Sequence, residues 1–140
     1  MKSSRTLIFK AILAAVAVAL STTTVAQRTS LACQEDASAG LNWERGEWTV
    51  KRFKTEKFIL VQEGKSLTTD SVGRAFNKGS IFVSCFVKST GVICIANMGE
   101  SLLFNPESMK GARTHSLGSI STDPAYRDSI AIAPFSCQPF

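Results

Sequence analysis

The chain has 140 residues, and its 16 basic and 11 acidic side chains give a formal net charge of +5. Three of the basic residues and none of the acidic ones lie in the first 26 residues, so thirteen basic and eleven acidic residues, a net charge of +2, remain beyond them. This balance is weak support for a nucleic-acid partner, and we expect none. The length beyond residue 26 is enough for one domain around one core.

The amino-terminal segment has the pattern of a secretory signal peptide. Basic residues precede an uninterrupted apolar run at residues 11–20, and small side chains stand before a cleavage point after Ala26. The pattern predicts that residues 1–26 are removed and that residues 27–140 form a single β-rich domain in a bacterial periplasm or outside the cell. The basic residues are Lys2, Arg5 and Lys10.

Two other interpretations of this segment are a membrane anchor and a lipoprotein signal. Ten helical residues span about 15 Å, which is roughly half of a bilayer core, so we expect no transmembrane span after cleavage. Lipidation would use Cys33, but Ser30 and Leu31 fit the residues that such a signal requires poorly.

The first part of the exported chain predicts β-structure after a loose start at residues 27–30. Residues 39–43 and 48–53 flank a four-residue turn and are expected to form a hairpin. This turn length places Trp43 opposite Trp48 and Leu41 opposite Val50, so that all four side chains share one face packed on the core. The apolar run at residues 58–61 predicts a buried strand.

Further strands are expected after a short helical segment at residues 68–77. Residues 80–88 and 92–97 predict the clearest hairpin, and residues 101–104, 112–121 and 129–133 predict three more segments. The fold class expected is all-β: a small single-domain antiparallel barrel or sandwich of about seven to eight short strands, stapled by disulfides.

Four cysteines allow three disulfide connectivities, and strand register discriminates between them. A register with Val87 opposite Val92 places Cys85 opposite Cys94 and gathers apolar side chains on one face. Directly opposed cysteines are close enough to be bridged, which predicts Cys85–Cys94 and leaves Cys33–Cys137 to join the ends of the domain. The competing register, with a three-residue loop, puts Cys85 and Cys94 on opposite faces.

The sequence contains no recognisable catalytic or metal-binding motif. His115 is the single histidine, no Gly-x-Ser-x-Gly or Ser-x-x-Lys motif is present, and a surface position is the default for His115. One histidine and four oxidised cysteines are too few ligands for zinc, so no metal or other cofactor is expected. The acidic residues Asp70, Asp123 and Asp128 are too scattered for a calcium loop.

Two kinds of segment are candidates for binding. The most basic stretch is residues 51–54 with Lys57, although charges on a strand divide between its two faces. The segments at residues 73–76 and 111–113 are interpreted as glycine-led loops, each with an arginine, and loops of this kind present binding residues on β scaffolds. The candidate binding residues are therefore Arg74 and Arg113, together with Ser71.

Residues 71–76, with the sequence SVGRAF, resemble the serine-glycine-arginine-aromatic loop of the periplasmic C-type lysozyme inhibitor family. The resemblance covers about six residues, and the order of arginine and alanine is reversed relative to the family's usual order. It implies a small exported β-barrel, in which Ser71 and Arg74 would belong to the loop that enters the lysozyme cleft.

The sequence as a whole favours an exported binding or interaction protein rather than an enzyme. This expectation rests on the lack of nucleophile and cofactor motifs around the single histidine. Its partner is unknown, and an envelope or extracellular protein is one class that fits. The alternatives are an inhibitor of an enzyme such as lysozyme and a small envelope hydrolase, which would need a cleft with a perturbed carboxylate or histidine.

Overall fold

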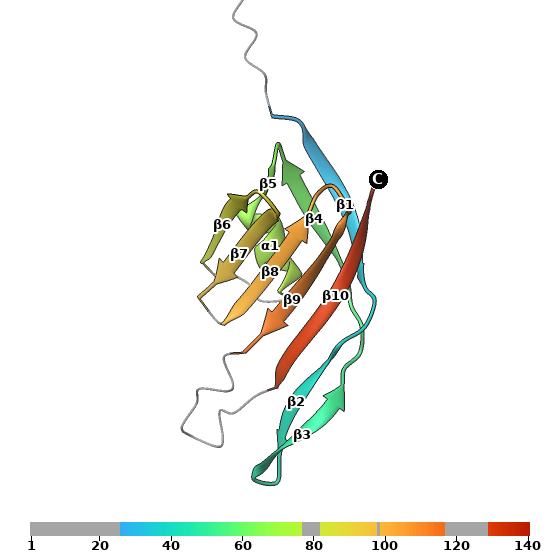
Figure 1. The fold of residues 1–140 in the computed structure, drawn as a ribbon, viewed down its shortest axis with the longest axis vertical. Helices are drawn as coiled ribbons and strands as arrows, with labels where there is room; N and C mark the ends of the chain where they lie inside the picture. Colours follow the sequence, from blue (N-terminus) through green and yellow to red (C-terminus); the bar gives the residue numbers. More distant parts are fainter. Residues whose placement is uncertain (1–25, 77–81, 98, 117–128) are drawn as a thin grey trace, which may run out of the picture.

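The computed structural model describes residues 26–76, 82–97, 99–116 and 129–140. Ten strands and one helix are found within these ranges (Figure 1). In chain order the elements are β1 (Arg28–Glu35), β2 (Ala39–Glu44), β3 (Glu47–Arg52), β4 (Lys57–Glu63), β5 (Ser66–Leu67), α1 (Thr69–Ala75), β6 (Val83–Lys88), β7 (Gly91–Ala96), β8 (Glu100–Asn105), β9 (Lys110–His115) and β10 (Ile130–Pro139).

Eight of the strands form one antiparallel sheet in the order β5-β4-β1-β10-β9-β8-β7-β6. The sheet curls until β5 approaches β6, and α1 lies between its two ends, where it contacts β4, β6 and β7 (Figure 1). The result is a nearly closed barrel, which confirms the predicted all-β fold class. The remaining strands, β2 and β3, form a hairpin that joins the sheet only through β2 and β10.

The core follows from the alternation of side chains along each strand. Alternate residues of β1, β7, β8 and β10 point inward, and they include the fully buried side chains of Leu31, Leu102 and Phe135. Phe135 lies at the centre, with its ring centroid 5.1 Å from that of Phe58 and 6.3 Å from that of Phe104. Burial of each such side chain stabilises the fold by about 1.5–3 kcal/mol.

Gly111 makes room for the central ring. It pairs with Phe135 across the β9–β10 ladder, and an added Cβ would lie 2.3 Å from Phe135 Cζ and 2.3 Å from the Leu103 carbonyl oxygen. Because ring and backbone would both have to move, we expect Gly111→Ala to lower the free energy of unfolding by about 1–3 kcal/mol. Urea denaturation measures the change. Ala112→Val, on the outer face of the same strand, is the control, and equal midpoints for Gly111→Ala and wild type would contradict the packing described here.

Both predicted disulfides are present. Cys33 is bonded to Cys137 and Cys85 to Cys94, with Cα–Cα distances of 4.0 and 4.1 Å. The members of each pair are direct register partners on neighbouring strands. The register with Val87 opposite Val92, on which the prediction was based, is also confirmed.

Three expectations about the strands need correction. The loose start was wrong, because residues 28–30 belong to β1 and pair with residues 61–63 of β4. The last strand is longer than residues 129–133, since β10 pairs with β1 over residues 135–139. The β2–β3 register is as expected, but Val50 is 87% exposed, so this face of the hairpin does not pack on the core.

Several predicted features lie outside the described residues. They include residues 1–25 of the signal peptide, residues 117–121 of the expected segment 112–121, and the acidic residues Asp123 and Asp128. In the portion of the chain that is described, no helix has the length and apolar character needed to cross a membrane.

Candidate functional site

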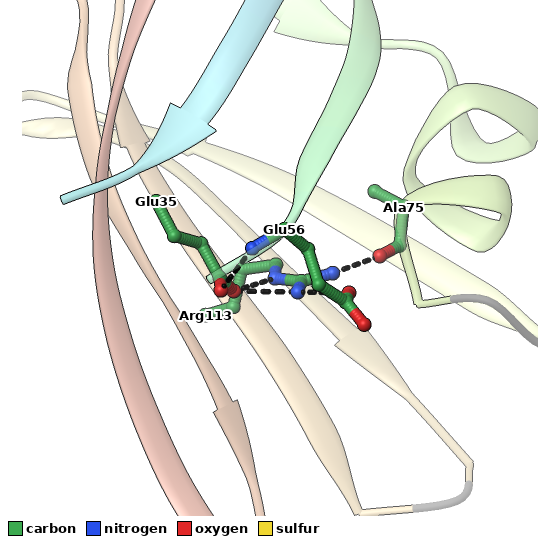
Figure 2. Close-up of polar contacts among 4 residues, drawn as sticks. All are labelled: Glu35, Glu56, Ala75 and Arg113. Atoms are coloured by element: carbon green, nitrogen blue, oxygen red, sulfur yellow. Dashed lines mark hydrogen bonds and ion pairs between the residues drawn. The ribbon is translucent and has the colours of Figure 1, made fainter. Parts of the chain in front are cut away.

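Arg113 joins four separate segments of the chain at one end of the barrel (Figure 2). Its Nε donates to Oε1 of Glu35 at 2.9 Å, and its Nη2 donates to the same oxygen and to Oε2 of Glu56 at 2.7 Å. Its Nη1 donates to the backbone oxygen of Ala75, and the guanidinium lies over the ring of Phe58, 4.7 Å from the centroid. The guanidinium group of Arg113 is therefore contacted by other residues of the chain along its edges and on one face.

Local structure explains why these groups meet. Arg113 occupies an inward position of β9, between Leu102 of β8 and Ala133 of β10. Glu35 is the last residue of β1, and Glu56 directly precedes β4. Ala75 ends α1, where backbone carbonyls have no partner inside the helix, so an arginine donor there satisfies one of them.

Glu35 is the most deeply buried member of this network. Its side chain is 2% exposed, and that of Arg113 is 13% exposed. The second carboxylate oxygen of Glu35 accepts a hydrogen bond from the backbone N–H of Glu56 at 2.9 Å. A buried carboxylate is tolerated only when it is paired and hydrogen-bonded, and Glu35 meets both conditions.

A second buried carboxylate lies on β8, the strand next to β9, and it faces the residue two positions beyond Arg113. Glu100 on β8 and His115 on β9 are register partners, and His115 Nδ1 lies 3.3 Å from Glu100 Oε1. The side chain of Glu100 is 3% exposed and that of His115 is 21% exposed. His115 is thus half-enclosed beside a carboxylate, and the expected surface position was wrong.

These side chains line an open pocket of about 300 Å³ at this end of the barrel, which we call the end pocket. Its wall combines aromatic and small apolar side chains with charged groups from both pairs. The lining residues are Glu35, Ser38, Phe53, Lys54, Glu56, Phe76, Glu100, Arg113, Thr114, His115, Ala131 and Ala133. This mixture of apolar area and a few convergent polar groups is typical of sites for small molecules.

The three predicted binding residues have different environments. Arg113 lies in the wall of the end pocket, on β9 rather than in a loop. Arg74 is on α1, 63% exposed, and forms an ion pair with Asp70 one turn earlier. The segments at residues 73–76 and 111–113 were wrongly interpreted as loops, because local glycines do not prevent helix or strand formation when tertiary contacts favour it.

Ser71 is fully buried on α1. Its Oγ accepts a hydrogen bond from the Val61 N–H at 3.0 Å and donates to the Thr68 carbonyl oxygen at 2.9 Å. This serine therefore holds the helix against β4, and its side chain is buried rather than presented at the surface. Lysozyme inhibition stays a prediction, and unchanged lysozyme lysis rates in the presence of purified protein would eliminate it.

Glu35, Glu56 and Glu100 were not predicted as site residues from the sequence. A signal was present for two of them, because Glu35 and Glu100 occupy inward positions in otherwise apolar strand patterns. A charged residue at such a position predicts a buried ion pair. Glu56 carries no such signal, since it lies between strands.

Comparisons with known proteins do not assign this site. No protein-family model matches the chain, and no curated protein and no solved structure matches it. Among the described residues, no group of three or more histidine, cysteine, aspartate or glutamate side chains is arranged to hold a metal ion.

Proposed function

We propose that this protein is an exported binding protein that takes a small ligand in the end pocket. The observation that carries the proposal is the open pocket of about 300 Å³, which falls at the lower end of the volumes of small-molecule sites. Phe53 and Phe76 supply apolar contact area, and Glu100 and His115 supply polar groups that would orient the ligand. The signal-peptide pattern and the two disulfides support export.

The network around Arg113 supports a fixed pocket rather than a mobile one. Arg113 ties β1, the segment before β4, β9 and the end of α1 together, so the wall is built before any ligand arrives. A preformed site loses less conformational freedom on binding, which favours affinity for a small molecule. The site residues are therefore assigned two roles: Arg113 and Glu35 position the wall, and the groups around His115 contact the ligand.

The pocket is tested by filling it. Ala131 lines the end pocket on β10, and Ala131→Phe is expected to abolish the rise in melting temperature that a bound ligand causes. The measurement is a thermal-shift screen of the purified protein against a panel of amines, carboxylic acids, sugars and nucleosides. The matched control is Ile132→Phe, at the next residue, whose side chain is 55% exposed on the outer face. A ligand that stabilises wild type and Ala131→Phe equally would overturn the assignment of the pocket.

Export is tested separately. Protein secreted by a Gram-negative expression host is expected to begin at Gln27 and to contain no free thiol. Mass spectrometry of the intact protein, before and after thiol alkylation, measures both properties. An unprocessed chain retained in the cytosol would contradict export while leaving the binding test unaffected.

One observation favours hydrolysis as a second candidate function. Ser38 lines the same pocket as the Glu100–His115 pair, and a histidine oriented by a carboxylate is the base that activates a serine nucleophile. We expect such an enzyme to hydrolyse activated esters and to lose this activity in both Ser38→Ala and His115→Gln. Turnover that survives both substitutions, or its absence in wild type, would eliminate this candidate.

A further inference from the structure

The outer side of strands β6 to β10 exposes large apolar side chains. These five strands lie side by side (Figure 1), and α1 packs on their inner side, because Val72 of the helix shares one core with Leu102 of β8. No element of the described chain packs on the outer side. Four large apolar side chains there are between 46% and 55% exposed: Phe86, Ile95, Leu103 and Ile132.

The outward side chains form two neighbouring rows across the five strands, which we call the apolar face. The first row is apolar throughout and consists of Phe86, Ile93, Leu103, Ala112 and Pro134. The second row mixes hydroxyl and apolar side chains and consists of Ser84, Ile95, Ser101, Thr114 and Ile132. Neither row contains a charged residue. Monomeric proteins rarely expose a continuous apolar surface of this extent, and such surfaces mark contact sites.

The relief and the hydrogen bonds of the apolar face suit it to being covered. Ser101 Oγ and Thr114 Oγ1 are hydrogen-bonded to each other at 2.6 Å, so burying them costs less than burying two separate hydroxyls. A hollow of about 250 Å³ lies beside Ile93, Leu103 and Ala112, which gives opposing side chains room to interdigitate. Of the two rows, only Thr114 also lines the end pocket.

The apolar face is complementary to a second copy of itself. A two-fold axis that runs across the strands, between the two rows, places each residue of the first row over the second-row residue of the same strand in the other copy. Phe86 then lies over Ser84, and Leu103 lies over Ser101, so large side chains meet small ones. Lys88 and Lys110 flank the first row, and this axis sets the lysines of the two copies at opposite ends of the interface.

The area of the apolar face matches what a dimer needs. One further row beyond each end brings the face to about 24 Å across the five strands and about 27 Å along them, an area of about 650 Å². Two copies would bury about 1,300 Å² in total, which lies in the range of specific protein interfaces, about 1,200–2,000 Å². An uncharged centre with lysines only at its margin is also the arrangement found in homodimer interfaces.

We propose that the apolar face is the interface of a homodimer, in which two copies pack their sheets face to face about this two-fold axis. Packed sheets lie about 10 Å apart, so the outward side chains of both copies fill the space between them as in a sandwich core. The absence of charge lets the same surface serve on both copies, since no like charges meet at its centre. This inference does not depend on a ligand in the end pocket.

The test measures the oligomeric state of the secreted protein. Sedimentation velocity over a range of concentrations is expected to show a reversible equilibrium between monomer and dimer, with a Kd at about the micromolar level or below. The association is expected to persist at high salt, because its centre contains no charged residue.

Three variants locate the contact. Leu103→Glu is expected to raise the Kd of the dimer about tenfold or more, because the two-fold axis brings two carboxylates into one apolar centre. Phe86→Glu, at a half-exposed position of β6, is expected to act in the same way. Ile59→Glu is the matched control, since Ile59 is 51% exposed on β4, outside the apolar face, and its Kd is expected to equal that of wild type. Circular dichroism checks that all three variants are folded.

Several outcomes would overturn the proposal. A protein that stays monomeric up to about 1 mM has no such interface. A dimer that neither Leu103→Glu nor Phe86→Glu weakens, or that Ile59→Glu weakens equally, forms through another surface. Binding of the monomer to phosphatidylcholine vesicles, lost in Leu103→Glu, would assign the apolar face to a lipid surface instead.

Discussion

Replacing Arg113 with methionine is expected to lower the free energy of unfolding by about 3–5 kcal/mol. The reason is the carboxylate of Glu35, whose side chain is 2% exposed and would remain buried without its cationic partner. Glu56 and the carbonyl oxygen of Ala75 would lose a hydrogen bond at the same time. Urea denaturation followed by circular dichroism gives the free energy.

Two controls isolate the buried ion pair. Arg74→Met breaks the exposed pair with Asp70, and we expect a change of about 1 kcal/mol or less because solvent screens that pair. The double variant Arg113→Met with Glu35→Met removes both buried charges and is expected to be more stable than Arg113→Met alone. A loss below about 1 kcal/mol for Arg113→Met would show that Arg113 does not hold the wall of the end pocket.

Removing the two disulfides is expected to have unequal effects. The Cys33–Cys137 bond closes a loop with a sequence separation of 104, and the Cys85–Cys94 bond closes one with a separation of 9. Loop-closure entropy then predicts losses of about 5 kcal/mol for Cys33→Ala with Cys137→Ala and about 3 kcal/mol for Cys85→Ala with Cys94→Ala.

Thermal unfolding of the two double variants measures this order. Each pair joins directly opposed residues of neighbouring strands, so the chain connection and not the local geometry distinguishes them. The variant without Cys33–Cys137 is therefore expected to melt at the lower temperature. A lower melting temperature for the variant without Cys85–Cys94 would contradict the entropic explanation and would point to loss of packing around Cys94, which is fully buried.

Local pattern was sufficient to predict the fold class and two hairpin registers. Alternation of apolar residues on residues 83–87 and 92–96 fixes which side chains face inward, and the turn length then sets Cys85 opposite Cys94. The same reasoning placed Trp43 opposite Trp48. Alternation identifies an apolar face but does not show what covers it, which is why Val50 was expected in the core.

The first strand was missed for a different reason. Residues 28–30 are polar and have no strong strand preference, and β1 forms because β4 and β10 pair with it on both sides. These partners lie about 30 and 100 residues away along the chain, so no local window contains them. The extension of β10 through Pro134 has the same long-range origin.

The end pocket could be anticipated only in part. Glu35 and Arg113 are separated by 78 residues and Glu56 and Arg113 by 57, so their meeting depends on the closure of the sheet. A buried-charge signal was available at Glu35 and Glu100, as inward positions of β1 and β8. His115 was expected at the surface because nothing near it in the sequence indicated a partner. Its partner Glu100 lies beside it only across the β8–β9 ladder.

Binding of a small ligand in the end pocket is the central property proposed for this protein. The most direct measurement is a ¹H–¹⁵N correlation spectrum of the secreted protein, titrated with the compound that raises its melting temperature most. We expect the amide signals that shift to belong to residues around Phe53, Phe76 and His115, and we expect Ala131→Phe to suppress these shifts. Shifts confined to the β6–β7 hairpin or to the outer face of the sheet, with those three residues unchanged, would contradict it.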